Sequence, residues 1–245
     1  MAVRHCSQLF TIINATLTVS FTGATETVGM TVLTCMMVMA LNLDKQRLAQ
    51  EEIDRVVGGD RMPNISDRAD LPYVDAVIKE TMRWQPALPL GFPRATTRDD
   101  DYNGYHIPKS TYVFANTWYI SREHNEKYDP DEFIPEQFLN PDEPVRDPWS
   151  YAFGFGRRVC PGRYLAEDTV FILIVTILAM FKLEPLAEGE LTPKFTLTII
   201  WSVIISIPVI FTDPRISYPK PFKCRIIPRS EAKARLILSK SMSAI

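Results

Sequence analysis

The stretch FGFGRRVCPG, from Phe153 to Gly162, places one cysteine in a tightly constrained setting. A metal-binding thiolate needs positive or donor-rich surroundings to keep its pKa low. Gly156 and Gly162 would let the backbone turn tightly and approach a flat partner, and the start of a following helix would favour an anion at Cys160. Arg158 could pair with a carboxylate of a bound group, and Phe153 would shield the sulfur from water. The alternative is a buried structural cysteine in a glycine turn.

The other cysteines and histidines suggest no second metal site. The four cysteines are far apart and form no C-x-x-C pair, and the three histidines are widely spaced. We therefore expect neither a zinc ribbon nor a disulfide framework, and no cage of histidine ligands. A reducing compartment is the better expectation for such a chain.

Length and composition are those of an ordinary globular chain. The 245 residues are 46% hydrophobic and 23% charged, with a net charge of −2, so nucleic acid is not an expected partner. No uninterrupted apolar run reaches the ~18 residues typical of a membrane span. The N-terminus is too polar in its centre for a secretory signal.

Hydrophobic periodicity and turn residues predict one mainly α domain, with small β-sheets, over residues 1–245. Proline (19 residues) outnumbers glycine (10 residues), which predicts an irregular middle. The expected segments are a long helix at 1–41, a surface helix at 43–58, a helix at 71–84, small strands at 92–116, a proline-rich meander at 128–152, the cysteine loop at 153–162, a helix at 162–182 and strands at 183–230.

Two further residue pairs lie on predicted helices. Glu80 and Arg83 are three residues apart, so they share one helix face and can form an ion pair. Alone, such a pair is most simply a solvated surface contact. Glu26 and Thr27 lie in FTGATETVG on the first helix, where a threonine ordinarily bonds back to its own turn.

Taken together, these motifs resemble the cytochrome P-450 family of haem-thiolate monooxygenases. Residues 153–162 match its haem-binding signature F-x-x-G-x-R-x-C-x-G, and Glu80 of the E-x-x-R pair precedes Cys160 by eighty residues, in the family's order. The segments DRADLPYVDAVIKETMRW, YNGYHIPKSTYVFANTW and YPKPFKCRIIPRS look like those of fungal microsomal members. The resemblance implies a truncated cytochrome P-450 fold that lacks the N-terminal half.

The resemblance also implies roles for individual residues. Cys160 would bind the iron of haem b, and a buried Glu80–Arg83 pair would brace its loop. The family's usual third member of that brace is an arginine, which is replaced here by Gln137 in Pro135-Glu136-Gln137-Phe138. An uncharged amide would leave the buried carboxylate less well compensated.

Two more sites follow from the resemblance. Glu26 and Thr27 would help to deliver protons to dioxygen, beside a local gap in the hydrogen bonds of the long helix. Arg94 falls where the family often has a residue that reaches a haem propionate; the alternative is a solvent-exposed arginine at the start of a strand.

The implied function is insertion of one oxygen atom from O2 into an apolar small molecule, in secondary metabolism, with electrons from NADPH-cytochrome reductase. One alternative is a truncated, non-catalytic remnant with weak or no haem binding. Another is a haem-thiolate isomerase or dehydratase. The resemblance implies the cytosolic face of the endoplasmic reticulum membrane, and a cytosolic location if no anchor is present. We also expect exposed apolar surface at Leu9, Ile12, Ile13, Val32, Leu33 and Met36, because the family's other half covers this helix.

Overall fold

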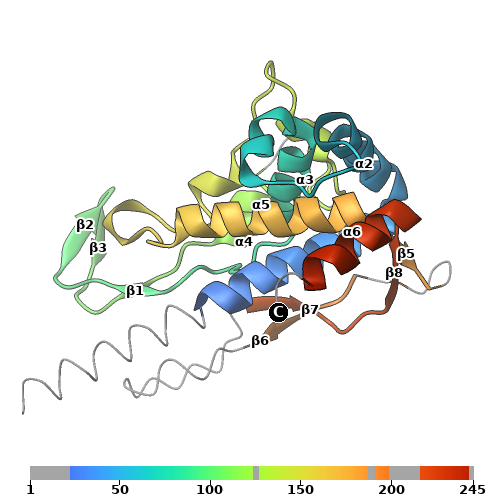
Figure 1. Ribbon diagram of the computed structural model, residues 1–245. Helices are drawn as coiled ribbons and strands as arrows, with labels where there is room; N and C mark the ends of the chain where they lie inside the picture. The colour runs from blue at the N-terminus through green and yellow to red at the C-terminus, as the bar shows by residue number, and fades with distance from the viewer. Residues whose placement is uncertain (1–22, 124–126, 187–190, 192, 199–215, 243–245) are drawn as a thin grey trace, which may run out of the picture.

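The computed structural model describes residues 23–123, 127–186, 191, 193–198 and 216–242. Within these ranges the chain is mainly helical, and its strands form four separate two-stranded antiparallel sheets. Figure 1 shows helix α5, Arg163–Met180, crossing the middle of the molecule, with α2 and α3 above it and the N-terminal helix, Gly23–Leu41, below. The predicted architecture of helices with small sheets is thus observed.

The N-terminal helix contributes one face to the core. Cys35, Met37, Val38 and Met39 are each 2% exposed or less, and they belong to the same hydrophobic cluster as residues of α5. By length and composition this helix could cross a membrane, although 44% of its most apolar window is buried inside the protein. The expectation of exposed surface holds for Leu33, which is 42% exposed.

The same expectation is wrong for Val32, which is 8% exposed because it packs into the core cluster, and Met36 is partly buried against that cluster. Leu9, Ile12 and Ile13 lie outside the described residues, as does the predicted helix over residues 1–22.

Helices α2, Leu43–Val57, and α3, Pro72–Trp84, pack on α5 and on each other. A buried amide fixes this arrangement: Gln46 donates to the carbonyls of Met39 and Leu183 at 2.9 and 2.8 Å, and accepts from the Leu183 amide at 2.9 Å. Glu52 accepts hydrogen bonds from the first amides of α3, those of Tyr73 and Val74, at 3.0 and 2.9 Å. It therefore caps a helix that has no capping side chain of its own.

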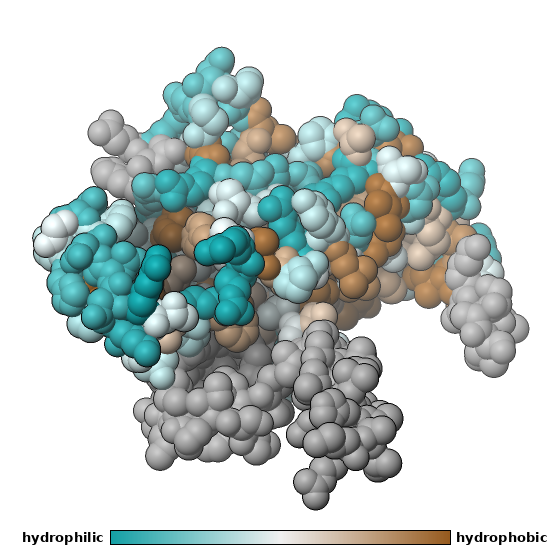
Figure 2. Space-filling view, turned by 90° about the vertical axis from the view of Figure 1, so that its left-hand side faces the viewer, coloured by the Kyte–Doolittle hydropathy of each residue, from teal (hydrophilic) through white to brown (hydrophobic). Residues whose placement is uncertain are grey.

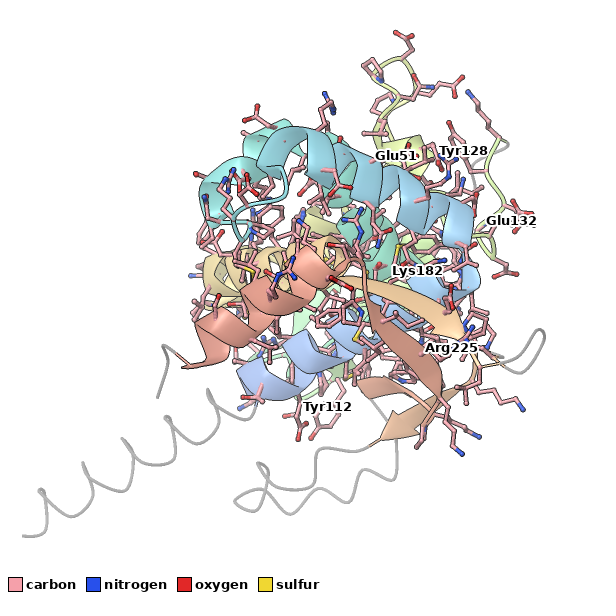
Figure 3. All side chains as sticks on the ribbon, turned by 45° about the vertical axis from the view of Figure 1, so that its right-hand side comes forward. Glu51, Tyr112, Tyr128, Glu132, Lys182 and Arg225 are labelled. Atoms are coloured by element: carbon pink, nitrogen blue, oxygen red, sulfur yellow. The ribbon has the colours of Figure 1, made fainter. Side chains whose placement is uncertain are left out.

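Short strands lie at the periphery. Strands β1, Arg94–Ala95, and β4, Tyr112–Val113, form one pair. Strands β2, Asp100–Tyr102, and β3, Tyr105–Ile107, form a hairpin through Asn103-Gly104, both with positive φ. Strands β5, Phe181–Pro185, and β8, Cys224–Pro228, form a third pair. Lys182 and Arg225, labelled in Figure 3, lie on these neighbouring strands, and both pair with Glu184. Strands β6, Phe195–Thr198, and β7, Ile216–Pro219, form the fourth.

The proline-rich segment at 128–152, which we call the meander, is less irregular than expected. It contains the 3₁₀ turns η2, Pro135–Phe138, and η3, Pro148–Ser150. Other short elements are η1, Ile65–Asp70, α4, Thr117–Ser121, and η4, Gly156–Arg158. Tyr128 and Glu132, labelled in Figure 3, lie on the meander at the edge of the molecule.

A C-terminal helix, α6, Glu231–Met242, was not predicted from the sequence. The Ser230 hydroxyl caps it by accepting from the Lys233 amide at 3.2 Å. Lys233 in turn donates to the carbonyl of Gly58 at 3.1 Å, which ties α6 to the end of α2. The unusually apolar stretch Leu197 to Phe211 lies mostly outside the described residues, since residues 199–215 are not among them.

Candidate functional site

Residues 153–162, the Cys160 loop, close back on themselves just before α5. The amide of Cys160 donates to the carbonyl of Phe153 at 2.9 Å, and the Val159 amide donates to the Gly156 carbonyl at 3.1 Å. Gly162 is the N-cap of α5, an 18-residue helix. The thiol of Cys160 is free and exposed, so the alternative of a buried structural cysteine does not fit this structure. The loop presents its sulfur at the surface, beside a helix N-terminus.

The glycines of the loop do not all act as the sequence suggested. Gly156 has φ +58°, and a Cβ built there would meet nothing within 4 Å, so its backbone borders open space. Gly154, which was not singled out, has φ +82°. Gly162 has φ −85°, which any residue can adopt, and a Cβ there would lie 3.9 Å from the Cys160 sulfur. The chain does turn at Gly162, where the Arg163 amide donates to the Cys160 carbonyl at 3.4 Å, but this turn needs no positive φ. The small size of Gly162 leaves clearance beside the sulfur.

Arg94, from strand β1, reaches the Cys160 loop. Its Nη2 donates to the carbonyl of Arg158 at 3.3 Å, across sixty-four residues of sequence, and both arginines are exposed. Arg94 therefore reaches the loop from β1, and Arg158 belongs to the loop itself. Arginine binds carboxylates through two parallel hydrogen bonds, so this edge suits a ligand that carries carboxylates.

Exposed apolar side chains adjoin the same loop. Phe155 and Val159 are 51% and 40% exposed, and Phe92, before β1, is 54% exposed. Figure 2 views the molecule from the side that carries the β2–β3 hairpin and shows hydrophobic surface between hydrophilic side chains. Phe153 is only partly buried, and its ring stacks on Trp149 with 5.5 Å between centroids. The Phe153 ring therefore packs against Trp149. The expected shielding of the Cys160 sulfur from water is not seen, because Cys160 is exposed.

Glu80 and Arg83 form a buried, fully bonded ion pair, with side chains 0% and 7% exposed. Arg83 donates to both carboxylate oxygens, at 2.6 and 2.8 Å. Its remaining N–H groups reach backbone carbonyls of the meander, at Pro130 (3.0 Å) and Glu132 (2.9 Å). Because both side chains are buried, the pair is not a solvated surface contact. Its hydrogen bonds to Pro130 and Glu132 hold the meander against α3.

Gln137 completes this cluster, which we call the brace (Glu80, Arg83 and Gln137). Its amide nitrogen donates to Glu80 Oε2 at 2.8 Å, and the Ile134 amide donates to Oε1 at 2.6 Å. Burial raises the pKa of Glu80, although the hydrogen bonds from Arg83, Ile134 and Gln137 oppose that rise. Gln137 thus supplies a hydrogen bond without supplying a charge.

A cavity lies on the meander side of the brace. Its volume is about 430 Å³, and its walls include Arg83, Gln137 and Tyr151. The Tyr151 hydroxyl is buried and has no hydrogen-bond partner among the described residues. The side chain at position 137 therefore borders unfilled space, into which a longer side chain could extend.

Thr27 and Glu26 lie near the start of the described helix and are half-buried. The Thr27 hydroxyl donates to the Gly23 carbonyl at 2.8 Å, four residues earlier. From Gly23 to Leu41 the helix is continuous, so the expected gap in its hydrogen bonds is not seen. The local bond of the threonine hydroxyl occupies the carbonyl that such a gap would leave free.

The residues around Cys160 fit haem as a ligand. An exposed thiol beside a helix N-terminus suits iron, open space at Gly156 accepts a flat ring, and Arg94 and Arg158 suit its carboxylates. Among the described residues, no cluster of three or more histidine, cysteine or acidic side chains offers another metal site. The fold and this loop define the class of haem-thiolate proteins.

Comparisons with known proteins agree with this class. The family model described as "Cytochrome P450" matches residues 10–209. Cytochrome P450 monooxygenase claR of Ampulloclitocybe clavipes is 39% identical over 220 residues, which are 88% of this chain and 38% of that protein. Cytochrome P450 monooxygenase drtD of Aspergillus calidoustus is 40% identical over 206 residues, or 84% of this chain and 36% of that one.

A solved structure gives the same result. A zebra fish cytochrome P450, titled as a structure with progesterone, superposes with a TM-score of 0.69 at 29% identity, and the match covers 86% of this chain and 44% of that one. The chain therefore belongs to the cytochrome P450 family and has a partial cytochrome P450 fold, as predicted. Family membership indicates haem as its cofactor. The chain spans about two fifths of the length of these curated relatives.

Sequence reasoning missed the residues that connect α3 with the Cys160 loop. Trp149 was not singled out, although it is 8% exposed and stacks on Phe153. Asp147-Pro148 was an available signal, because aspartate before proline is a typical start of a helical turn. Lys79, beside Glu80, binds that aspartate at 3.1 Å. No local pattern in the sequence shows that these segments meet.

Proposed function

We propose that this chain is the haem-binding part of a haem-thiolate monooxygenase that inserts one oxygen atom from O2 into an apolar small molecule. The observation that carries the proposal is the exposed Cys160, whose amide donates to the Phe153 carbonyl just before α5, in a loop that contains Arg158 and is reached by Arg94. The alternative of an isomerase or dehydratase gains no support from the names of the curated relatives, which are monooxygenases.

The bound haem would supply dioxygen binding and oxygen–oxygen bond cleavage, promoted by the thiolate ligand. Cys160 would provide the sulfur ligand, and the N-terminus of α5 would favour its negative charge. Arg158 and Arg94 would hold the carboxylates and so fix the orientation of the ring. Gly156 and Gly162 would leave clearance for the ring beside the sulfur, and Phe153 would anchor the loop through its carbonyl.

Glu26 and Thr27 would move protons toward bound dioxygen. While Thr27 Oγ1 donates to the Gly23 carbonyl, its lone pairs remain available to accept a proton or a hydrogen bond. Glu26 lies next to it and could resupply that proton from solvent, because its side chain is only half-buried. Glu80 and Arg83 would not touch the ligand and would act by holding the meander.

The proposed partners follow from the family. NADPH-cytochrome reductase would supply electrons, and the substrate would be an apolar molecule of fungal secondary metabolism. The proposed location is the cytosolic face of the endoplasmic reticulum membrane. These assignments are supported by fungal relatives at about 40% identity.

The test is a turnover experiment with the full chain, haem, a fungal NADPH-cytochrome reductase and a panel of apolar terpenoids under ¹⁸O2. The proposal predicts products that carry one ¹⁸O atom and depend on NADPH. Products without ¹⁸O would instead favour the isomerase or dehydratase, and the absence of haem binding would favour the non-catalytic remnant. The Cys160→Ala variant is the matched control and should give no labelled product.

A further inference from the structure

We propose that Lys79 is a positioning residue for Cys160, acting through Asp147, Trp149 and Phe153. This inference deepens the proposed function, because it concerns the residue that would bind haem iron. It rests on an unbroken series of contacts from helix α3 to the Cys160 amide, separate from the hydrogen bonds of the brace.

The first contact is an ion pair between α3 and the meander. Lys79 Nζ lies 3.1 Å from Asp147 Oδ2 and 3.2 Å from Asp75 Oδ2, and the lysine side chain is 22% exposed. Burial opposes the charge of Lys79, but the hydrogen bonds and fields of Asp147 and Asp75 outweigh it, so its pKa lies above the ordinary value. The ammonium group is thus charged at neutral pH and is shared between its own helix and the meander.

The second contact passes through the other oxygen of the same carboxylate. Asp147 Oδ1 accepts a hydrogen bond from the Trp149 amide at 2.9 Å, which makes Asp147 the N-cap of the turn η3. One carboxylate therefore faces Lys79 with one oxygen and fixes the start of η3 with the other. Rotation of Asp147 would break both bonds together, so the lysine helps to hold the capping geometry.

The third contact joins η3 to the Cys160 loop. The Trp149 ring stacks on the Phe153 ring at 5.5 Å and an interplanar angle of 14°, and the Arg68 guanidinium lies 5.7 Å from the Trp149 ring centre. The backbone carbonyl of Phe153 then accepts the amide of Cys160 at 2.9 Å. A shift of Trp149 would therefore reach the residue that closes the loop on the cysteine.

This series reaches closer to the loop than the brace does. Arg83 and Glu80 bond to the meander at Pro130, Glu132, Ile134 and Gln137. Lys79 instead holds Asp147, which is six residues before Phe153. The two groups leave α3 from adjacent positions and secure different ends of the meander, so loss of one should leave the other in place.

Hydrogen exchange at the Cys160 amide tests the proposal directly, because that amide makes the last hydrogen bond of the series. In the full chain without added haem, Lys79→Met should speed exchange of this amide roughly five-fold. That factor corresponds to a decrease of ~1 kcal/mol in the free energy needed to open its hydrogen bond. Asp147→Asn should have a similar effect, because the amide oxygen can still cap η3 while the ion pair is lost. Lys79→Arg should restore the wild-type rate.

The matched control is Lys127→Met, which removes the ion pair, at 2.6 Å, between a lysine just before the meander and Glu143 of the meander. It should leave exchange at Cys160 unchanged. The proposal is overturned if Lys79→Met and Asp147→Asn exchange like wild type, or if Lys127→Met accelerates exchange as much as they do. Asp147 is 44% exposed, so its asparagine variant should fold even if Lys79→Met does not.

A second readout uses haem. The Lys79→Met variant should show a smaller share of the thiolate-ligated form in the reduced, carbon monoxide-bound spectrum than wild type, with Lys79→Arg again restoring it. If wild type itself shows no thiolate-ligated form, the proposed function fails. The exchange rates measured without haem still decide the role of Lys79 in that case.

Discussion

The brace and the Cys160 loop are built in opposite ways. Glu80 is fully buried, and its carboxylate accepts hydrogen bonds from Arg83, Gln137 and the Ile134 amide. Cys160 is exposed, and its loop shows apolar side chains and open space at Gly156 to the surface. The brace is completed by protein groups alone, whereas the loop offers groups that suit a ligand. The residues of the brace therefore stabilise the fold, whereas those of the Cys160 loop are the ones available to bind a ligand.

The largest expected effect on stability comes from removing the carboxylate of the brace. Glu80→Ala leaves the buried Arg83 guanidinium without its counter-charge, which costs about 3–5 kcal/mol of unfolding free energy. Urea unfolding measures this loss. The matched control is Glu51→Ala, which breaks a surface pair with Arg47 (side chains 58% and 64% exposed) and should cost at most about 1 kcal/mol. Equal losses in the two variants would contradict the comparison.

Removing the amide of Gln137 should lower the free energy of unfolding less than removing the Glu80 carboxylate does. Gln137→Met keeps the side-chain length and removes the hydrogen bond to Glu80 Oε2. A hydrogen bond to a charged group contributes about 1.5–3 kcal/mol, so urea unfolding should show a loss in that range. A variant as stable as wild type would mean that the ion pair needs no third member.

Replacing Gln137 by the family's usual arginine should raise the free energy of unfolding instead of lowering it. Gln137→Arg places a second guanidinium beside Glu80, and the cavity of about 430 Å³ next to Gln137 offers room for it. Because a second positive charge lowers the pKa of Glu80, the chain should become more stable at neutral pH, and urea unfolding of Gln137→Arg measures that gain. A less stable variant would show that burying another charge costs more than the pairing returns.

The pH dependence of stability should distinguish Glu80 from its neighbour Glu136. Burial raises the pKa of Glu80 in the folded chain, so its contribution to stability is present below the unfolded pKa and is lost as pH rises through the folded pKa. For Glu136, burial favours a rise, but hydrogen bonds from Lys45 and Tyr73 outweigh it and lower the pKa. Its contribution is present above the unfolded pKa and is lost as pH falls through the folded pKa.

Unfolding free energies between pH 3 and pH 8, compared with those of Glu80→Gln and Glu136→Gln, give these two contributions. The slopes for the two residues should have opposite signs. Slopes of the same sign would mean that the four donors around Glu80 outweigh its burial.

The smallest expected effect on stability belongs to Cys160, the proposed ligand of haem iron. Cys160→Ala removes an exposed thiol that forms no disulfide, and surface substitutions of this kind usually change stability by about 0.5 kcal/mol or less. Thermal unfolding of the haem-free chain measures it. A loss comparable to that of Glu80→Ala would show that the sulfur is structural.

The sequence predicted those features that depend on local pattern. Helix α3 lies within the helix predicted at 71–84, and strands β1 to β4 lie within the strands predicted at 92–116. Glu80 and Arg83 could be paired from their spacing, but the carbonyls of Pro130 and Glu132 that hold Arg83 could not. The sequence gives no distance between segments that meet only after folding.

Helix α6 illustrates the same limit. Lys233 binds the Gly58 carbonyl and Arg229 binds Asp54, and each contact spans 175 residues of sequence. Its own apolar pattern is weak, since Leu238 is 63% exposed, so tertiary contacts outweigh local preference here.

The most direct test is the absorption spectrum of the reduced, carbon monoxide-bound haem complex of the full chain, compared between wild type, Cys160→Ala and the control Cys224→Ala. Cys224 is also a free cysteine and is partly exposed. We predict the strongly red-shifted Soret band of thiolate ligation in wild type and in Cys224→Ala, and its loss in Cys160→Ala. A spectrum that Cys160→Ala leaves unchanged would contradict the assignment of Cys160 as the ligand of haem iron.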